Sequence, residues 1–151
     1  MDYLTDTKPS VDEISAYDNA IKELLEREIK IKASRELGKK YYEEYTKTLN
    51  IAKNENKNVL MLFYLSGCNG CTVIKHLLSY SKKVISLINQ KQYIVLTFDM
   101  SEAESVLAKK YNIYAYPAYL LVDNQGKTIK HGQGCLVENG PENFFINWLN
   151  K

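Results

Sequence analysis

Two cysteines lie three positions apart, at Cys68 and Cys71, and their surroundings predict a reactive dithiol. An apolar run, Val59–Tyr64, precedes the pair, and a segment with helical spacing, Thr72–Leu78, follows it. The pattern predicts a strand that delivers both cysteines onto the first turn of a helix. Free N–H groups and the helix dipole at such a start stabilise a thiolate, the reactive form of cysteine. The second cysteine lies close enough to close a small disulfide ring or to attack a mixed disulfide at the first.

The composition is that of an ordinary globular protein of one domain, with 151 residues of which 45% are hydrophobic and 25% are charged. A net charge of +2 gives no reason to invoke nucleic acid or acidic lipid. No stretch approaches the roughly 20 apolar residues of a membrane helix, so no membrane segment is expected. The start of the chain lacks the basic and apolar regions of a signal peptide. A cytoplasmic location is therefore expected for the sequence as written, and a periplasmic or secreted one if a signal peptide has been removed.

Residues 1–56 are polar and helix-forming. Ser10 and Glu13 have the spacing of a capping box, in which each side chain satisfies a main-chain N–H of the other's residue. Apolar residues then recur at helical spacing at Ile14, Tyr17, Ile21, Leu24, Leu25 and Ile29. Gly38 either ends this helix or only weakens it, and a second periodic stretch follows over residues 41–52. Two interpretations stay open: an arm that packs one face on the domain, or an arm that dimerises or binds a partner.

The remainder of the chain alternates between strand and helix patterns. Strands are predicted at residues 59–64, 93–98, 118–122 and 127–131, the last two joined by a turn. A helix is predicted from the cysteines towards residue 78, and residues 82–89 either continue it or form another helical turn. Further helices are predicted after a cap at Ser101 and from Pro141 to the end of the chain. This order predicts a central sheet covered by helices on both faces. The crossover between the first two strands predicts that they are parallel.

Several segments together resemble the thioredoxin superfamily, in particular its bacterial thioredoxin-like oxidoreductase branch. They are the strand before the cysteines, the Cys-X-X-Cys helix start, Tyr111-Asn112-Ile113, Tyr116-Pro117 and the turn Asp123-Asn124-Gln125-Gly126. The resemblance covers residues 46–150. It implies an α/β thioredoxin fold, a central mixed sheet flanked by helices, over residues 46–151. Residues 1–45 then form an N-terminal helical extension outside the family pattern.

The resemblance also implies roles for individual residues. Cys68 matches the exposed nucleophile and Cys71 the resolving thiol of a thiol–disulfide oxidoreductase. Pro117 matches a cis-proline that faces the cysteines and leaves the Tyr116 backbone free to pair with a substrate. The expected partners are protein disulfides and a reductase or oxidase that recycles the protein. No metal is expected, and no cofactor beyond the redox-active Cys68–Cys71 disulfide.

Three departures from the family pattern bear on this function. Gly67 replaces the usual tryptophan before the nucleophile, and Asn69-Gly70 replaces Gly-Pro between the cysteines. Leu62 stands where typical thioredoxins carry a buried acid that assists the resolving thiol. These changes support an alternative, a thioredoxin-fold binding or scaffold module without efficient turnover.

Cys135 is the third cysteine, and its role is open between three interpretations. It is a small cysteine without chemistry, a redox partner or glutathionylation site near the pair, or a member of a Cys3His metal set with His131, Cys68 and Cys71. The facing proline loop disfavours the metal set. His76, two turns into the helix after the cysteines, is interpreted as a surface or core residue rather than a catalytic base.

Overall fold

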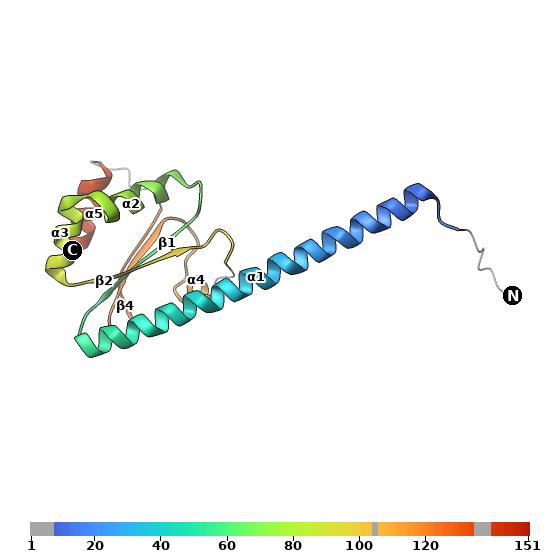
Figure 1. Ribbon diagram of the computed structural model, residues 1–151. Coiled ribbons are helices and arrows are strands. Elements are labelled where there is room, and N and C mark those ends of the chain that lie inside the picture. Colours follow the sequence, from blue (N-terminus) through green and yellow to red (C-terminus); the bar gives the residue numbers. More distant parts are fainter. Residues whose placement is uncertain (1–7, 104–105, 135–139) are drawn as a thin grey trace.

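The computed structural model describes residues 8–103, 106–134 and 140–151, and within them the strands form one four-stranded sheet (Figure 1). The strand order is β2-β1-β3-β4, with bounds β1 Val59–Tyr64, β2 Ile94–Asp99, β3 Ala118–Val122 and β4 Thr128–Gln133. Strands β1 and β2 run parallel, as predicted, whereas β1–β3 and β3–β4 are antiparallel. The mixed sheet of the predicted thioredoxin fold is therefore confirmed.

Helices cover both faces of this sheet. One face carries α2 (Asn69–Tyr80), α3 (Lys82–Lys91) and α5 (Pro141–Asn150), and the other carries α4 (Val106–Lys110) and the second half of α1 (Val11–Glu55). Because side chains alternate along a strand, β1 supplies both cores. Val59, Met61 and Phe63 pack with α1 and α4, whereas Leu60 and Leu62 pack beneath α2, α3 and α5.

Helix α1 is continuous from Val11 to Glu55 and does not end at Gly38. The Ser10–Glu13 capping box is present, with Glu13 N donating to Ser10 Oγ at 3.2 Å and Ser10 N donating to Glu13 Oε2 at 3.0 Å. Gly38 is buried against the domain. An interior glycine costs only about 1 kcal/mol relative to alanine, which packing of the following turns offsets. The division between residues 45 and 46 thus falls inside a single helix.

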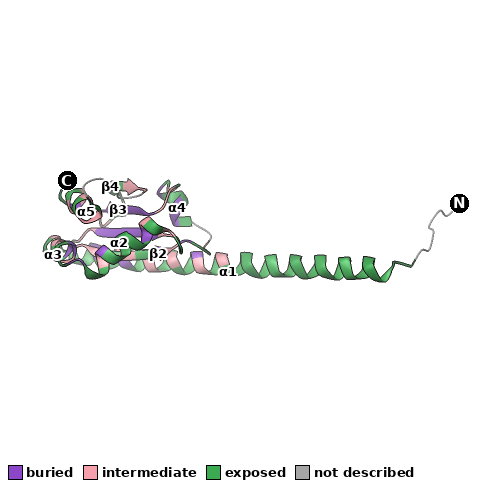
Figure 2. Ribbon diagram, turned by 90° about the horizontal axis from the view of Figure 1, so that it is seen from above, coloured by how far each residue is buried: buried purple, intermediate pink, exposed green. Residues whose placement is uncertain are grey.

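The first half of α1 projects away from the sheet, and every residue from 11 to 33 is exposed (Figure 2). Only the later turns contact the domain, through the buried residues Gly38, Tyr45, Thr48 and Ala52. Of the two interpretations, packing on the domain is therefore wrong for the apolar stripe from Ile14 to Ile29, and its pairing with a second copy or a partner stays a prediction. The stripe extends past the edge of the sheet, where the domain has no surface to cover it.

Two smaller differences concern serines. Ser81 separates α2 from α3 and caps the second, because its Oγ accepts from Val84 N at 3.2 Å. Ser101 does not cap a helix as predicted, since the described part of α4 begins five residues later; its hydroxyl instead bonds Asp99. Among the residues described, no helix combines the length and the apolar character needed to cross a membrane.

Candidate functional site

The cysteine pair lies at the start of α2, just after the loop that connects β1 to α2. Gly67 adopts a positive φ of 78°, and Cys68 is the extended N-cap residue of α2, with φ −83° and ψ 118°. Its Sγ accepts a hydrogen bond from Cys71 N at 3.3 Å. A side chain that accepts from the third helical N–H satisfies one of the free donors of the helix start. The predicted position of the pair on the first turn is confirmed, and it aims a main-chain donor at the Cys68 sulfur.

The two sulfurs differ in their access to solvent. Cys68 is partly exposed, whereas Cys71 is 1% exposed and lies inside the core. A molecule approaching from solvent can therefore meet the Cys68 sulfur first, and Cys71 lies one helical turn behind it.

The segment Tyr116–Pro117 faces this pair. The peptide bond between them is cis, the isomer that the family resemblance implied. The Cys68 thiol points at the Tyr116 carbonyl, with 3.9 Å between sulfur and oxygen. Burial raises the pKa of the Tyr116 hydroxyl, and the negative charge of a Cys71 thiolate raises it further. The Tyr116 main chain therefore lies at Cys68, and its hydroxyl is within electrostatic range of Cys71.

A glutamine that sequence reasoning missed holds this segment in place. Gln133 Oε1, at the end of β4, accepts from Tyr114 N at 3.0 Å and from Ala115 N at 2.9 Å. Gly134 N donates to the Pro117 carbonyl at 2.9 Å. The end of β4 thus fixes the backbone that faces Cys68. A glutamine in a short polar strand carries no signal for such a role, because the bond depends on the fold.

A cluster of hydrogen bonds around one carboxylate, Asp99, holds the other side of the cysteine loop. Sequence reasoning missed this cluster as well. Asp99, the last residue of β2, accepts from Ser66 Oγ at 3.1 Å, from Ser101 Oγ at 2.7 Å and from Ser101 N at 3.0 Å. Ser66 N in turn donates to Ser101 Oγ at 2.7 Å. The Ser101 hydroxyl is the main reason that the pKa of Asp99 is lowered, with help from Ser66 and from the positive charge of Lys75.

This cluster ties the residue two before Cys68 to the neighbouring strand. The sequence feature that could have indicated this cluster is the predicted parallel pairing of β1 and β2, because the carboxyl ends of parallel strands meet at one edge of the sheet. Tyr41 of α1 lies beside the same edge, with its ring 5.2 Å from that of Phe98. Burial raises the pKa of Tyr41, and the charge of Asp99 raises it further. The projecting helix therefore begins its contact with the domain close to the cysteine loop.

Leu62 lies in the apolar cluster beneath α2, where it is 1% exposed and packs with Ile74 and Leu77. This position therefore provides an apolar surface in place of a carboxylate. His76 is exposed on α2, with its ring 4.9 Å from that of Tyr80, which agrees with its interpretation as a surface residue.

The third cysteine, Cys135, lies outside the described residues. His131 is exposed on β4, and the partial burial of its ring lowers its pKa. Among the residues that the structure describes, no group of three or more histidine, cysteine and acidic side chains could hold a metal ion.

A mixed sheet with a Cys-X-X-Cys pair at a helix start and a proline loop opposite defines a thioredoxin-fold protein. The model of the thioredoxin-like domain family matches residues 45–143. The chain belongs to this family. No curated protein matches it.

Several solved structures share the fold. A disulphide isomerase from Xylella fastidiosa is similar with a TM-score of 0.63 and 20% identity, over 72% of this chain and 88% of that one. A thioredoxin from Thermus thermophilus gives 0.56 and 17%, over 70% and 81%. A thioredoxin-fold protein from Helicobacter pylori gives 0.52 and 22%, over 64% and 68%. At these identities the likeness concerns the fold alone.

Proposed function

We propose that the protein is a thiol–disulfide oxidoreductase that exchanges disulfides with protein substrates through Cys68 and Cys71. The observation that supports this most is the difference in access between the two sulfurs, one partly exposed at a helix start and one buried a turn behind. A substrate disulfide can reach only the first. The second is placed to react with the mixed disulfide after the substrate is attached.

As a reductant, the protein would act in two steps. The Cys68 thiolate attacks one sulfur of the substrate disulfide, the substrate S–S bond breaks, and the leaving thiolate takes a proton from solvent. Cys71 then loses its proton and attacks the Cys68 sulfur of the mixed disulfide, which releases the second substrate thiol. The substrate gains two electrons and two protons, and the protein keeps a Cys68–Cys71 disulfide. A recycling dithiol must reduce this disulfide, and the reverse sequence, recharged by a disulfide donor, oxidises substrates.

The proposed roles of Tyr116 and Pro117 follow from their position. The Tyr116 carbonyl faces the Cys68 thiol, so an extended substrate segment bound there would present its disulfide to the nucleophile. Main-chain pairing of this kind is insensitive to substrate side chains. We therefore expect extended segments of unfolded or flexible protein substrates.

One observation favours the alternative, a binding or scaffold module with slow turnover. Cys71 is buried, and Leu62, at the position where typical thioredoxins carry an acid that assists the resolving thiol, lies in the apolar cluster beneath α2. Substitution Leu62→Asp separates the two functions. If resolution by Cys71 limits turnover, an acid at this position accelerates release of the mixed disulfide, whereas a module gains nothing from it.

The test is reduction of insulin disulfides by the native protein, Cys68→Ser and Cys71→Ser, with dithiothreitol as the recycling dithiol. We expect Cys68→Ser to abolish reduction and Cys71→Ser to accumulate a covalent mixed disulfide, visible as a mass increase. In the reduced native protein, iodoacetamide should modify Cys68 before Cys71. Faster modification of Cys71, or equal activity of Cys68→Ser and native protein, contradicts the assignment. Equilibration with glutathione then gives the potential and the direction of electron flow.

A further inference from the structure

The projecting half of α1 carries a stripe of large apolar side chains in solvent. We call it the arm stripe; it consists of Ile14, Tyr17, Ile21, Leu24, Leu25 and Ile29, with exposures from 46% for Ile14 to 68% for Tyr17 and Ile29. Such a stripe at helical spacing ordinarily faces a core or a partner. Helices of this kind also gain most of their stability from packing rather than from intrinsic propensity. The arm stripe is therefore an apolar surface that no described part of the chain covers.

The chain's own domain cannot supply that complement. At about 100° per residue, the arm stripe is centred roughly 140° around the helix axis from the face of α1 that contacts the sheet. That contact face is made by Gly38, Tyr45, Thr48 and Ala52. Covering the stripe by the same domain would require α1 to break, and α1 is continuous. The occupant must come from another molecule.

The charges along α1 identify an occupant. Its first eight residues contain Asp12, Glu13 and Asp18 and no lysine or arginine. Residues 30–40, in contrast, contain five basic side chains and one acidic one: Lys30, Lys32, Arg35, Lys39, Lys40 and Glu36. Two copies lying antiparallel place the acidic start of each helix against the basic segment of the other. A parallel pair would place like charges together at both ends.

We propose that the arm stripe is a self-association surface, through which the α1 helices of two copies pair antiparallel. A register that sets Ile21 opposite Leu24 of the second copy places residues 11–18 of each helix opposite residues 27–34 of the other, which include Arg27, Lys30 and Lys32. This inference is independent of thiol exchange, because no residue of the cysteine site takes part. An anionic lipid surface fits poorly, since residues 11–33 hold six acidic and four basic side chains.

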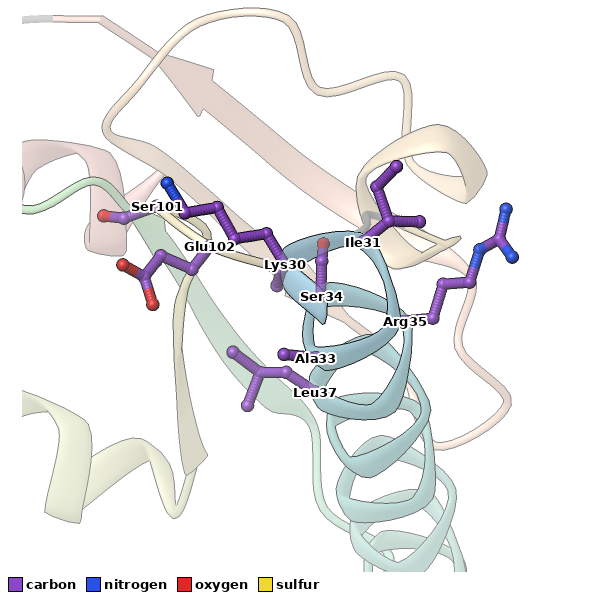
Figure 3. Close-up of a pocket in the computed structure, with 9 residues that line it drawn as sticks. Lys30, Ile31, Ala33, Ser34, Arg35, Leu37, Ser101 and Glu102 are labelled. Carbon is purple, nitrogen blue, oxygen red and sulfur yellow. The ribbon is translucent and has the colours of Figure 1, made fainter. Parts of the chain in front are cut away.

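A pocket of about 880 Å³ lies where α1 meets the domain (Figure 3). It is formed between α1 and residues 101–103, and its α1 side includes Lys30, Ile31 and Leu37. Figure 3 shows Lys30 extending towards the loop at Ser101. Apolar and charged side chains line it together, among them Leu37, Arg35 and Glu102. Most of the α1 residues that line this pocket lie on the side of the helix that faces the domain, away from the arm stripe, so the pocket takes no part in the proposed pairing.

The first experiment measures association of the full chain by sedimentation velocity over a range of concentrations. We expect a reversible dimer. The variant Ile21→Asp, which places a charge in the stripe of both copies, should raise the dimer dissociation constant at least about tenfold. Asn19→Asp is the matched control on the opposite side of the same turn and should change it less than about twofold. The proposal is overturned if the native chain is monomeric at every concentration. It is overturned equally if the chain stays monomeric and cosediments with vesicles of anionic phospholipid.

A second experiment tests the antiparallel orientation of the two helices. It does not depend on whether Ile21→Asp folds. Asp12→Lys with Asp18→Lys reverses the acidic start, and Lys30→Glu with Lys32→Glu reverses the basic segment. Each double variant alone should dimerise at least about tenfold more weakly than the native chain, and an equimolar mixture should recover native affinity. If the first double variant alone associates as tightly as the native chain, the helices are not antiparallel and the proposal is wrong.

Discussion

Substituting Asp99 by asparagine tests whether the hydrogen bonds from Ser66 and Ser101 to the Asp99 carboxylate stabilise the cysteine loop. The change keeps the size of the side chain and removes its charge. In the native protein the carboxylate accepts three hydrogen bonds, from Ser66 Oγ, Ser101 Oγ and Ser101 N, at 2.7 to 3.1 Å. Hydrogen bonds to a charged acceptor are about twice as strong as neutral ones. Because the serines are exposed, we expect a modest loss of about 1–2 kcal/mol in the free energy of unfolding.

The pH dependence gives this prediction its sign. The pKa of Asp99 is lowered in the folded protein, chiefly by the Ser101 hydroxyl, relative to about 3.9 in an unfolded chain. A carboxylate with a lowered folded-state pKa stabilises the fold above the unfolded value and loses that effect as the pH falls through the folded value. The difference between native protein and Asp99→Asn should therefore be full at pH 7 and shrink below about pH 4.

The assay is urea unfolding followed by fluorescence of Trp148. This is the only tryptophan of the chain, and it stacks on Phe145 and contacts Tyr119 edge-on, so it reports the domain rather than the projecting helix. With a slope of about 2 kcal/mol per molar urea, the midpoint at pH 7 should fall by about 0.5–1 M. Glu23→Gln, on the exposed part of α1 and outside the arm stripe, is the matched control and should leave the midpoint unchanged. An unchanged midpoint for Asp99→Asn, or a difference that grows in acid, would refute the reasoning.

Two further substitutions test packing at the far edge of the sheet. A Cβ at Gly132 would overlap the ring of the buried Tyr119, so Gly132→Ala should lower the free energy of unfolding by about 1–3 kcal/mol. Combination with Tyr119→Leu should remove most of that cost, and an undiminished cost in the double variant would show that the ring is not responsible. Lys130 Nζ donates to two main-chain carbonyls at the end of α5, at 3.0 and 3.1 Å, so Lys130→Met should cost about 1 kcal/mol in urea unfolding. The exposed Lys127→Met should cost nothing measurable; equal effects of the two substitutions would contradict the assignment.

The regular elements of the domain were predictable because their patterns are local. The strands Val59–Tyr64 and Ala118–Val122 were predicted at their observed bounds. Each is a short apolar run buried on both faces and bounded by polar or turn residues. The helix start at Cys68 was likewise visible from the change of pattern after Tyr64.

The arrangement of α1 and the supports of the cysteine loop were not predictable in the same way. An apolar stripe indicates that a helix has a partner and does not say which molecule provides it. Gly38 resembled a helix end, and only its burial against the domain explains why the helix continues. Gln133 and Asp99 act on residues far from them in the chain, through bonds that exist only after the strands have paired.

The straightness of the projecting helix determines how far apart two cysteine sites are held. A flexible linker of 23 residues would have a root-mean-square span of roughly 25 Å and would also sample short distances. A helix of the same length is about 35 Å long and samples none of them. In an antiparallel pair the two domains occupy opposite ends of this rod, so Cys68 of one copy cannot reach Cys68 of the other. Pairing through α1 would therefore protect both nucleophiles from a dead-end disulfide within the dimer, while each stays accessible to substrate.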